Sequence, residues 1–384
     1  DALLLDAVSR QMIADVPLGV FLSGGLDSSI IAALATRHSD NVRTFSLGFE
    51  NKLFDESDYA LAVAKHIGTE HTRFEVNAER LQEVVEDVLS YIDEPFADAS
   101  ASNMFILSRL TRQHVTVALS GDGADELFGG YSKHYGEFRA RQDNLLNAVI
   151  DSSGPLLRLL PGTRNSKLGR KIWQLQKYAR DRKLSKAERY WAWCCVQLPG
   201  EASSLLRHTG SIDEVNAIRG SYLQEIAPDG DMNDVFRADL RLVLDGDMLR
   251  KVDLMSMANS LEVRVPFLDH TLVEWAANLP ADWKVTAKQR KRILQDVGRP
   301  LLPELIYNRP KQGFEVPLRD WMRGPLRPEL DRLLFDRDFI MHQGLFRYKR
   351  ILELRDAVDS GQYAKEDMTL WALLTFQRFW ERWF

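Results

Sequence analysis

Cysteine is nearly absent from this sequence, whose 384 residues include only Cys194 and Cys195. Because neighbouring thiols rarely bridge each other without strain, we expect no structural disulfide and favour a reducing compartment, the cytoplasm. No apolar run reaches the length of about 20 residues that a membrane-spanning helix needs. The chain opens on Asp1 with no basic stretch ahead of its first apolar residues, which is not typical of a signal peptide. We therefore expect neither a secreted nor a membrane protein.

The sequence also lacks an excess of charge of either sign, because 50 basic and 55 acidic residues leave a net charge of −5. A segment rich in Lys and Arg, residues 164–189, is offset by acidic residues elsewhere, and we interpret it as a solvated helical face. Proteins that bind nucleic acids or membrane surfaces usually carry a basic excess. We expect a small-molecule substrate, with no nucleic-acid and no membrane partner.

The first part of the chain alternates between two kinds of segment. Short stretches rich in β-branched and aromatic residues are separated by longer stretches with apolar residues at helical spacing. Strands that alternate with helices indicate an α/β fold whose parallel sheet is covered on both faces. The predicted strands are residues 16–24, 42–49, 71–76 and 115–121.

Helical patterns dominate after Tyr131, and we find no internal repeat or low-complexity linker. We predict an α/β region over residues 1–140 and a largely helical region over residues 141–384. The second region is expected to pack on the first and to supply a loop around Lys311.

The stretch FLSGGLDSS follows the first predicted strand and leads into a predicted helix. In an open parallel sheet this first strand-to-helix turn is the usual place for a phosphate, because backbone N–H groups and the helix N-terminus can converge on an anion. The motif matches neither G-x-G-x-x-G nor the Lys-containing Walker loop. A carboxylate beside phosphate is repelled unless a cation lies between them, so we interpret Asp27 as a magnesium ligand.

A second stretch, LSGDGADELFGGY, also follows a predicted strand and contains Asp122, Asp125 and Glu126. Carboxyl ends of parallel strands share one edge of a sheet, so both stretches should lie on the same edge. Three neighbouring acids repel one another, and a divalent cation would offset that repulsion. The sequence therefore predicts a magnesium nucleotide site at this edge.

The pattern S-G-G-x-D-S resembles the PP-loop of the N-type ATP pyrophosphatases. The two stretches together, followed by LRKVDLMSMANSLEVRVPFLDH and YNRPKQGFEVP, are similar to the synthetase domain of the glutamine-hydrolysing asparagine synthetases. The resemblance covers nearly the whole chain and is weakest from about residue 137 to residue 232. It implies the sheet of the adenine nucleotide alpha hydrolase type.

The resemblance also implies roles for individual residues. Asp27 and Asp125 match the family's magnesium ligands, and Lys311 matches the lysine that reaches the α-phosphate of ATP. The residues with an implied catalytic role are Lys311, Asp122 and Asp27. Those implied to bind ATP are Phe21, Ser23, Gly24, Gly25, Asp27, Ser28, Leu47, Ser120 and Gly121. A weaker match assigns the carboxylate acceptor to Asp98, Ser100, Glu126, Asp247, Lys251 and Arg264, although a helix cap explains Asp98 and Ser100 equally well.

The chemistry implied by the resemblance is adenylation of a carboxylate by ATP and Mg²⁺, followed by attack of ammonia on the acyl-adenylate to give an amide. The family's glutaminase domain begins with an N-terminal cysteine, which this chain lacks, so we expect that domain to be absent here and free ammonia to be the nitrogen source. The acceptor would be aspartate or a related carboxylate. Whether the chain forms a homodimer is left open by the sequence.

Two departures from the family pattern bear on the acceptor. Asp122 stands where well-known asparagine synthetases have Glu, and EPFADASASN, residues 94–103, lacks the R-A-S-T pattern associated with aspartate binding. Three alternatives stay open: a ring-closing amide synthetase of the β-lactam or peptide cyclase type, a tRNA-modifying PP-loop enzyme, and a nucleotide sensor. The absence of Tyr at position 122 counts against the first, and the negative net charge counts against the second.

Overall fold

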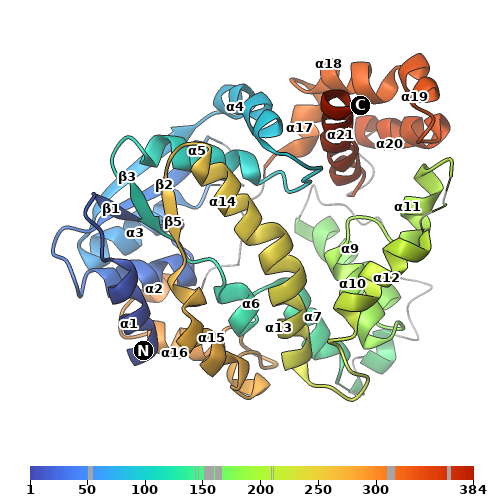
Figure 1. Ribbon diagram of the computed structural model, residues 1–384. Helices are drawn as coiled ribbons and strands as arrows, with labels where there is room; N and C mark the ends of the chain where they lie inside the picture. The colour runs from blue at the N-terminus through green and yellow to red at the C-terminus, as the bar shows by residue number, and fades with distance from the viewer. Residues whose placement is uncertain are drawn as a thin grey trace. The chain divides into compact units, whose positions relative to one another are not determined.

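The computed structural model describes residues 1–50, 55–142, 144–145, 147–150, 160, 167–208, 210, 212–308, 316–360 and 365–384. The chain forms two compact units (Figure 1). The first comprises Asp1–Tyr91, Asp98–Tyr135 and Asp239–Val316, and the second Ile92–Ala97, Gly136–Ala238 and Pro317–Phe384. This division differs from a single boundary near residue 140, because a later segment of the chain returns to the first unit.

The first unit contains a five-stranded parallel sheet in the order β3-β2-β1-β4-β5, which confirms the α/β prediction. Each of the four predicted strands is present. The fifth, β5, lies in a segment for which the sequence predicted no strand. The strands are β1 Leu18–Phe21, β2 Arg43–Phe49, β3 Glu70–Val76, β4 Val117–Leu119 and β5 Glu262–Arg264.

Strand order in the sheet reverses direction between β1 and β4. From β1 the chain moves outward to β2 and β3, and then crosses back to β4 on the other side of β1. Right-handed crossovers in opposite directions place their helices on opposite faces of a sheet. Loops that follow β1 and β4 consequently border the crevice where open α/β sheets bind ligands.

Helices of the first unit cover the sheet. On one side the central helix α2 Leu26–Ala35 is buried along nearly its whole length and shares a hydrophobic core with α1, α3, α6, α15 and α16. On the other side α5 packs against α4, α14 and β2. The remaining helices are α1 Ala2–Gln11, α3 Ser57–Ile67, α4 Ala78–Tyr91, α5 Ala101–Thr111, α6 Ala124–Phe128, α7 Ser132–Ala140, whose residues from Gly136 onward belong to the second unit, the π-helix η1 Leu240–Leu249, α14 Arg250–Met257, η2 Pro266–Leu268, α15 His270–Ala277, η3 Ala281–Trp283, α16 Arg292–Gly298 and η4 Glu304–Ile306.

The second unit is helical in the part that the structure describes. Cys194 ends α10, and it does not form a disulfide with Cys195. Burial raises the pKa of the Cys195 thiol, as expected for a packing residue rather than a nucleophile. The helices are α9 Lys167–Asp181, α10 Lys186–Cys194, α11 Pro199–Leu205, α12 Ile212–Leu223, α13 Met232–Asp239, α17 Leu318–Arg323, α18 Arg327–Leu330, η5 Asp331–Phe335, α19 Arg337–Gln343, α20 Tyr348–Ser360 and α21 Glu366–Trp383. Among the helices so described in both units, none is long and apolar enough to cross a membrane.

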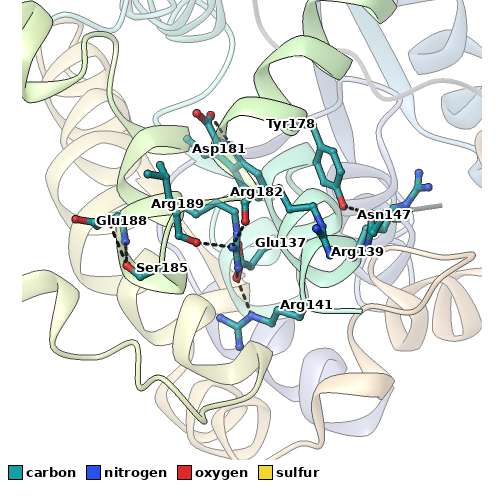
Figure 2. Close-up of polar contacts among 12 residues, drawn as sticks. Glu137, Arg139, Arg141, Asn147, Tyr178, Asp181, Arg182, Ser185, Glu188 and Arg189 are labelled. Carbon is teal, nitrogen blue, oxygen red and sulfur yellow. Dashed lines mark hydrogen bonds and ion pairs between the residues drawn. The ribbon is translucent and has the colours of Figure 1, made fainter. Parts of the chain in front are cut away.

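A buried ion-pair cluster lies inside the second unit (Figure 2). The Arg189 guanidinium donates from Nε to Glu137 Oε2 and from Nη2 to Glu137 Oε1, both at 2.6 Å. Arg141 Nε donates to the same carboxylate at 2.7 Å. Only 1% of the Glu137 side chain is exposed. One buried carboxylate therefore accepts hydrogen bonds from two arginines and is the ion-pair partner of both.

Replacing Glu137 with alanine should destabilise the protein by about 3–5 kcal/mol, because the variant leaves two buried guanidinium groups uncompensated. The Glu188→Ala variant is the control, since the Glu188 side chain is 54% exposed and such a surface charge contributes about 0–1 kcal/mol. Urea unfolding followed by tryptophan fluorescence would measure both. Equal unfolding midpoints for the two variants would contradict the prediction.

Candidate active site

The loop after β1, Leu22–Gly25, is closed by its own hydrogen bonds. The Ser23 N–H donates to Ser28 Oγ at 3.2 Å, and the Gly25 N–H donates to Ser23 Oγ at 3.2 Å. Gly24 has φ +70, and a Cβ on it would lie 2.5 Å from the backbone nitrogen of Ala60. Only glycine fits this left-handed and crowded position. Helix α2 begins directly after the loop, so its positive end faces the same space.

The loop after β4 contacts the first loop. A Cβ on Gly121 would lie 2.8 Å from the backbone nitrogen of Ser28 and 3.0 Å from Asp27 Cβ. The Ser120 hydroxyl donates to the Asp122 carboxylate within the second loop. The two motif stretches thus meet at one edge of the sheet, as the sequence predicted.

The side chain that joins the two loops is Lys291, at the start of α16. Its Nζ lies 2.5 Å from Asp27 Oδ2 and 2.7 Å from Asp125 Oδ1, and only 7% of the side chain is exposed. Burial alone would lower the pKa of this ammonium, but the charges of Asp125 and Asp27 outweigh it and the pKa is raised. Lys291 therefore carries a buried positive charge between the two predicted magnesium ligands.

Two backbone features make room for this lysine. Lys291 has φ 50, a left-handed conformation that is costly for a residue with a side chain. A Cβ on Gly130 would lie 1.9 Å from Lys291 Cε and 1.7 Å from Asp125 Oδ1, so the site requires glycine there. The second glycine of FGGY thereby gains a structural reason that sequence reasoning did not find.

Sequence reasoning missed Lys291 entirely. No motif marks it, since it is one of several basic residues between Lys284 and Arg292. Lys311, which was expected to serve as the cation of the site, lies outside the described residues. Phe21 and Leu47, assigned to ATP through their backbones, lie near the carboxyl ends of β1 and β2 and have buried side chains.

Glu126 is buried behind the second loop, with 1% of the residue exposed. Burial raises the pKa of its carboxyl to about 7, although the hydroxyl of Tyr131, which donates to Oε1 at 2.6 Å, acts in the opposite direction. Arg264 donates from Nε to Glu262 at 2.6 Å and from Nη1 to the carbonyl oxygens of Gln11 and Ile13. These contacts do not join Arg264 to the other residues assigned to the acceptor.

Four of the residues assigned to the acceptor do cluster. Lys251 Nζ donates to Asp98 Oδ2 at 2.9 Å and to Ser100 Oγ at 3.0 Å. Burial disfavours the Asp98 carboxylate, but the Lys251 charge outweighs this effect and the pKa of Asp98 is lowered. Burial, with the charge of Asp98 adding to it, raises the pKa of Asp247 to about 7. The cluster therefore combines an ionised and a neutral-prone carboxyl with one lysine.

A further buried group supports α7, and it was not predicted. Asp239 accepts from Lys133 Nζ at 2.6 Å and from His134 Nε2 at 2.5 Å. Burial disfavours the charge on Asp239, but Lys133 and His134 outweigh it and lower the pKa to about 2. Burial lowers the pKa of His134, which as a neutral ring donates Nε2–H to the carboxylate. The ion pair is therefore carried by Lys133 and Asp239.

These shifts predict loss of stability in acid. Asp239 titrates near 3.8 when unfolded and near 2 when folded, so its ionised form stabilises the fold by about 2 kcal/mol above pH ~4 and loses this as pH falls toward 2. His134 acts in the same direction below its ordinary value of 6.5. Urea unfolding at several pH values should show a flatter acid slope in Asp239→Asn than in wild type. The exposed Asp245→Asn variant should keep the wild-type slope.

The residues fit a magnesium ion only together with a nucleotide. Within the part of the chain that the structure describes, no group of three or more His, Cys, Asp or Glu residues is arranged to hold a metal ion. Magnesium in nucleotide sites is commonly held by one or two carboxylates plus phosphates and water. Asp27 and Asp125 supply two carboxylates that already converge on one cation, the Lys291 ammonium.

Comparison with known proteins finds a matching family and several relatives of similar sequence. The family model described as asparagine synthase matches residues 1–381. A Mycobacterium tuberculosis protein, provisionally named a glutamine-hydrolysing asparagine synthetase, is 39% identical over 84% of this chain and 48% of its own length. Asparagine synthetase (glutamine-hydrolysing) 1 of Bacillus subtilis is 32% identical over 84% of this chain and 50% of its own length. More distantly, amidase chyE of Penicillium rubens is 26% identical over 86% of this chain and 54% of its own length.

The match has a clear extent. The chain spans about half the length of the curated relatives that it matches. Within that half, the matched segment takes in both loops, the five strands and the segment that carries Lys291. The similarity to the asparagine synthetases inferred from the sequence motifs is confirmed, and this chain belongs to the asparagine synthase family.

Proposed function

We propose that this chain is an ATP-dependent amide-forming ligase that activates a carboxylate as an acyl-adenylate with release of pyrophosphate, and then passes the acyl group to ammonia. The observation that carries the proposal is the convergence of Asp27 and Asp125, from two different loops, on the ammonium group of Lys291. Paired carboxylates beside a glycine loop and a helix N-terminus suit a metal-bound polyphosphate. The family membership and the motifs support this type of reaction.

The residues then take distinct parts in the proposed reaction. The Ser23 and Gly25 N–H groups would exchange their hydrogen bonds within the loop for hydrogen bonds to the pyrophosphate end of ATP, which the Ser28 hydroxyl would also bind. Asp27 and Asp125 would hold Mg²⁺, which when bound neutralises charge on the leaving pyrophosphate. Lys291 lies where it can exchange one carboxylate for a phosphate oxygen and so add a second positive charge. The backbones near Phe21, Leu47 and Gly121 would hold adenine and ribose.

The acceptor and the nitrogen source belong to the same proposal. Asp98, Ser100, Asp247 and Lys251 line the acceptor side, and the acceptor is aspartate or a related carboxylate. Ammonia serves as the nucleophile for this chain, and the glutaminase activity in the relatives' names would belong to the part of those proteins that this chain does not match. The reaction would run in a reducing compartment such as the cytoplasm.

A pyrophosphate-release screen tests the proposal. The purified chain is given MgATP, ammonium chloride and a panel of carboxylates that includes aspartate, and products are identified by mass. We expect pyrophosphate and AMP to form only with the true acceptor, together with its amide. Reactions without acceptor, and with EDTA in place of Mg²⁺, are the controls. Release of ADP and phosphate in place of AMP and pyrophosphate would refute adenylation.

Replacing Lys311 with alanine should slow adenylation much more than it weakens binding of ATP. A cation aimed at charge that grows in the transition state contributes to the rate, by about 10²- to 10³-fold, rather than to ground-state affinity. Calorimetric titration of ATP and single-turnover pyrophosphate release would separate the two effects. A large loss of affinity with an unchanged rate at saturating ATP would make Lys311 a binding contact only.

A further inference from the structure

The cluster of Asp98, Asp247 and Lys251 lies at the edge of the sheet that carries the two loops. Helix α5 leads into β4, and α14 leads into β5, so both helices run antiparallel to parallel strands. Their N-terminal ends therefore lie at the carboxyl edge, and the two helices pack against each other (Figure 1). Asp98 lies three residues before the start of α5, and Lys251 is the second residue of α14.

The ammonium group of Lys251 is already hydrogen-bonded within the cluster. Lys251 Nζ donates to Asp98 Oδ2 and Ser100 Oγ, and also lies 3.6 Å from Met248 Sδ. With 8% of the residue exposed, its charge is committed to Asp98 rather than offered to a second anion. Within the cluster, the positive charge of Lys251 is thus already balanced by Asp98.

Asp247 is the member of the cluster with unused capacity. Its Oδ1 is buried, and no described residue makes a hydrogen bond to it. A buried oxygen without a partner is costly, and a ligand that carries N–H groups would satisfy it. Asp247 lies near the C-terminal end of η1, a π-helix, and such elements are frequent at functional sites.

The charges around Asp247 leave it poised between its two protonation states. Asp98, before α5, disfavours its ionised form, whereas Lys251 on α14 and Lys133 on α7 favour that form. Burial is the largest influence. Burial and Asp98 outweigh the two lysines, so the pKa of Asp247 is raised to about 7. The Asp122 carboxylate in the second loop favours the charged form of Lys251. The cluster therefore interacts electrostatically with the loop beside the nucleotide site.

We propose that Asp247, held beside Asp98 and Lys251, binds the incoming nitrogen nucleophile through its unpaired carboxylate oxygen and accepts the proton that the nucleophile loses. This inference rests on the proposed function and adds to it a residue and a step. The ligand class is a small N–H donor, ammonia or ammonium.

The step balances as follows. The nitrogen lone pair of ammonia forms the C–N bond, and the acyl C–O bond breaks so that its electron pair leaves with the phosphate of AMP. The nitrogen then carries one proton too many for a neutral amide, and that proton passes to the Asp247 carboxylate. Water removes it afterwards, when the products leave.

The test separates the two half-reactions. Rapid-quench assays follow pyrophosphate and amide in a single turnover, with the acceptor found in the screen and with free ammonia held constant from about pH 6 to about pH 9. In wild type the rate of amide formation should rise through about pH 7 and level off, because the base must be ionised. In Asp247→Asn the amide should form at least about 10²-fold more slowly, and its rate should not rise through about pH 7. Pyrophosphate should still appear in a burst before the amide.

Two variants control for structure. Asp245→Asn lies on the same π-helix with an exposed side chain and should behave as wild type. Asp247→Glu should restore part of the amide rate. If Asp247→Asn keeps the wild-type amide rate and pH profile, or if it loses pyrophosphate and amide in equal proportion, the proposal is overturned.

A second measurement needs no acceptor. In protein labelled with carbon-13 at the aspartate carboxyls, the signal that Asp247→Asn removes should shift on addition of ammonium chloride and stay in place with sodium chloride. A signal insensitive to ammonium would refute binding at Asp247. Absence of pyrophosphate release from wild type with every carboxylate would instead count against the proposed function, and the ammonium titration would still decide the site.

Discussion

Replacing Lys291 with methionine is expected to reduce acceptor-dependent pyrophosphate release by about 10²- to 10³-fold. The variant removes the cation that lies within 2.7 Å of both Asp27 and Asp125. Methionine keeps the length of the side chain, so packing around Gly130 changes little. Single-turnover rates at saturating MgATP measure the effect. Lys288→Met, at an exposed position in the same segment, is the matched control.

The same variant should also increase the stabilisation of the protein by magnesium. Without the ammonium, two carboxylates that are each about four-fifths buried repel each other, which should cost about 3 kcal/mol of stability. A magnesium ion can take the lysine's place, and at about 100 times its dissociation constant it would restore about 2.7 kcal/mol. Melting curves with and without MgCl₂ should therefore differ more for Lys291→Met than for wild type. Equal magnesium effects in the two proteins would show that the carboxylates do not form a cation site.

Asn at position 27 or 125 is expected to abolish pyrophosphate release, with a loss of about 10³-fold or more, equivalent to about 4 kcal/mol of transition-state stabilisation. Each carboxylate would bridge to phosphate through a divalent cation, and an amide of the same size keeps the shape but loses the charge. The fold should survive, because Lys291 still has one carboxylate partner in each variant. Asp58→Asn, an exposed aspartate at the start of α3, is the control.

The dependence of the rate on magnesium concentration tests whether these carboxylates hold the metal. If the carboxylates hold the metal, the small residual rate of Asp27→Asn or Asp125→Asn should need much more Mg²⁺ to saturate. Either variant turning over ATP at near the wild-type rate would remove that residue from the metal site. Circular dichroism and thermal melting check that any loss of rate is not a loss of structure.

The fold could be predicted from the sequence where local patterns carry the information. Strands β1 to β4 and their intervening helices were predicted because period and composition change sharply between them. Strand β5 was missed because it has only three residues, Glu262–Arg264, and its place beside β4 depends on a pairing distant in the sequence. For the same reason, nothing local indicated that residues 239–316 return to the first unit.

The candidate site, like the fold, could be predicted from the sequence only where local patterns carry the information. The two loops could be predicted to share an edge, because the carboxyl ends of parallel strands do so in general. Lys291 could not, since it lies 264 positions from Asp27 and reaches it only through a left-handed backbone and the space left by Gly130. The roles of the loop residues in binding ATP stay predictions until the variants are measured.

The return of residues 239–316 to the first unit sets the order in which the protein can be built. During synthesis β1 to β4 leave the ribosome first, but β5 and Lys291 follow only after the larger part of the second unit has been made. Until then β4 is an unpaired sheet edge, and Asp27 and Asp125 face each other without their cation. Such edges and late, long-range pairings slow folding and favour aggregation. A nascent chain that stalls before residue 291 would carry both motif loops and yet have no assembled site.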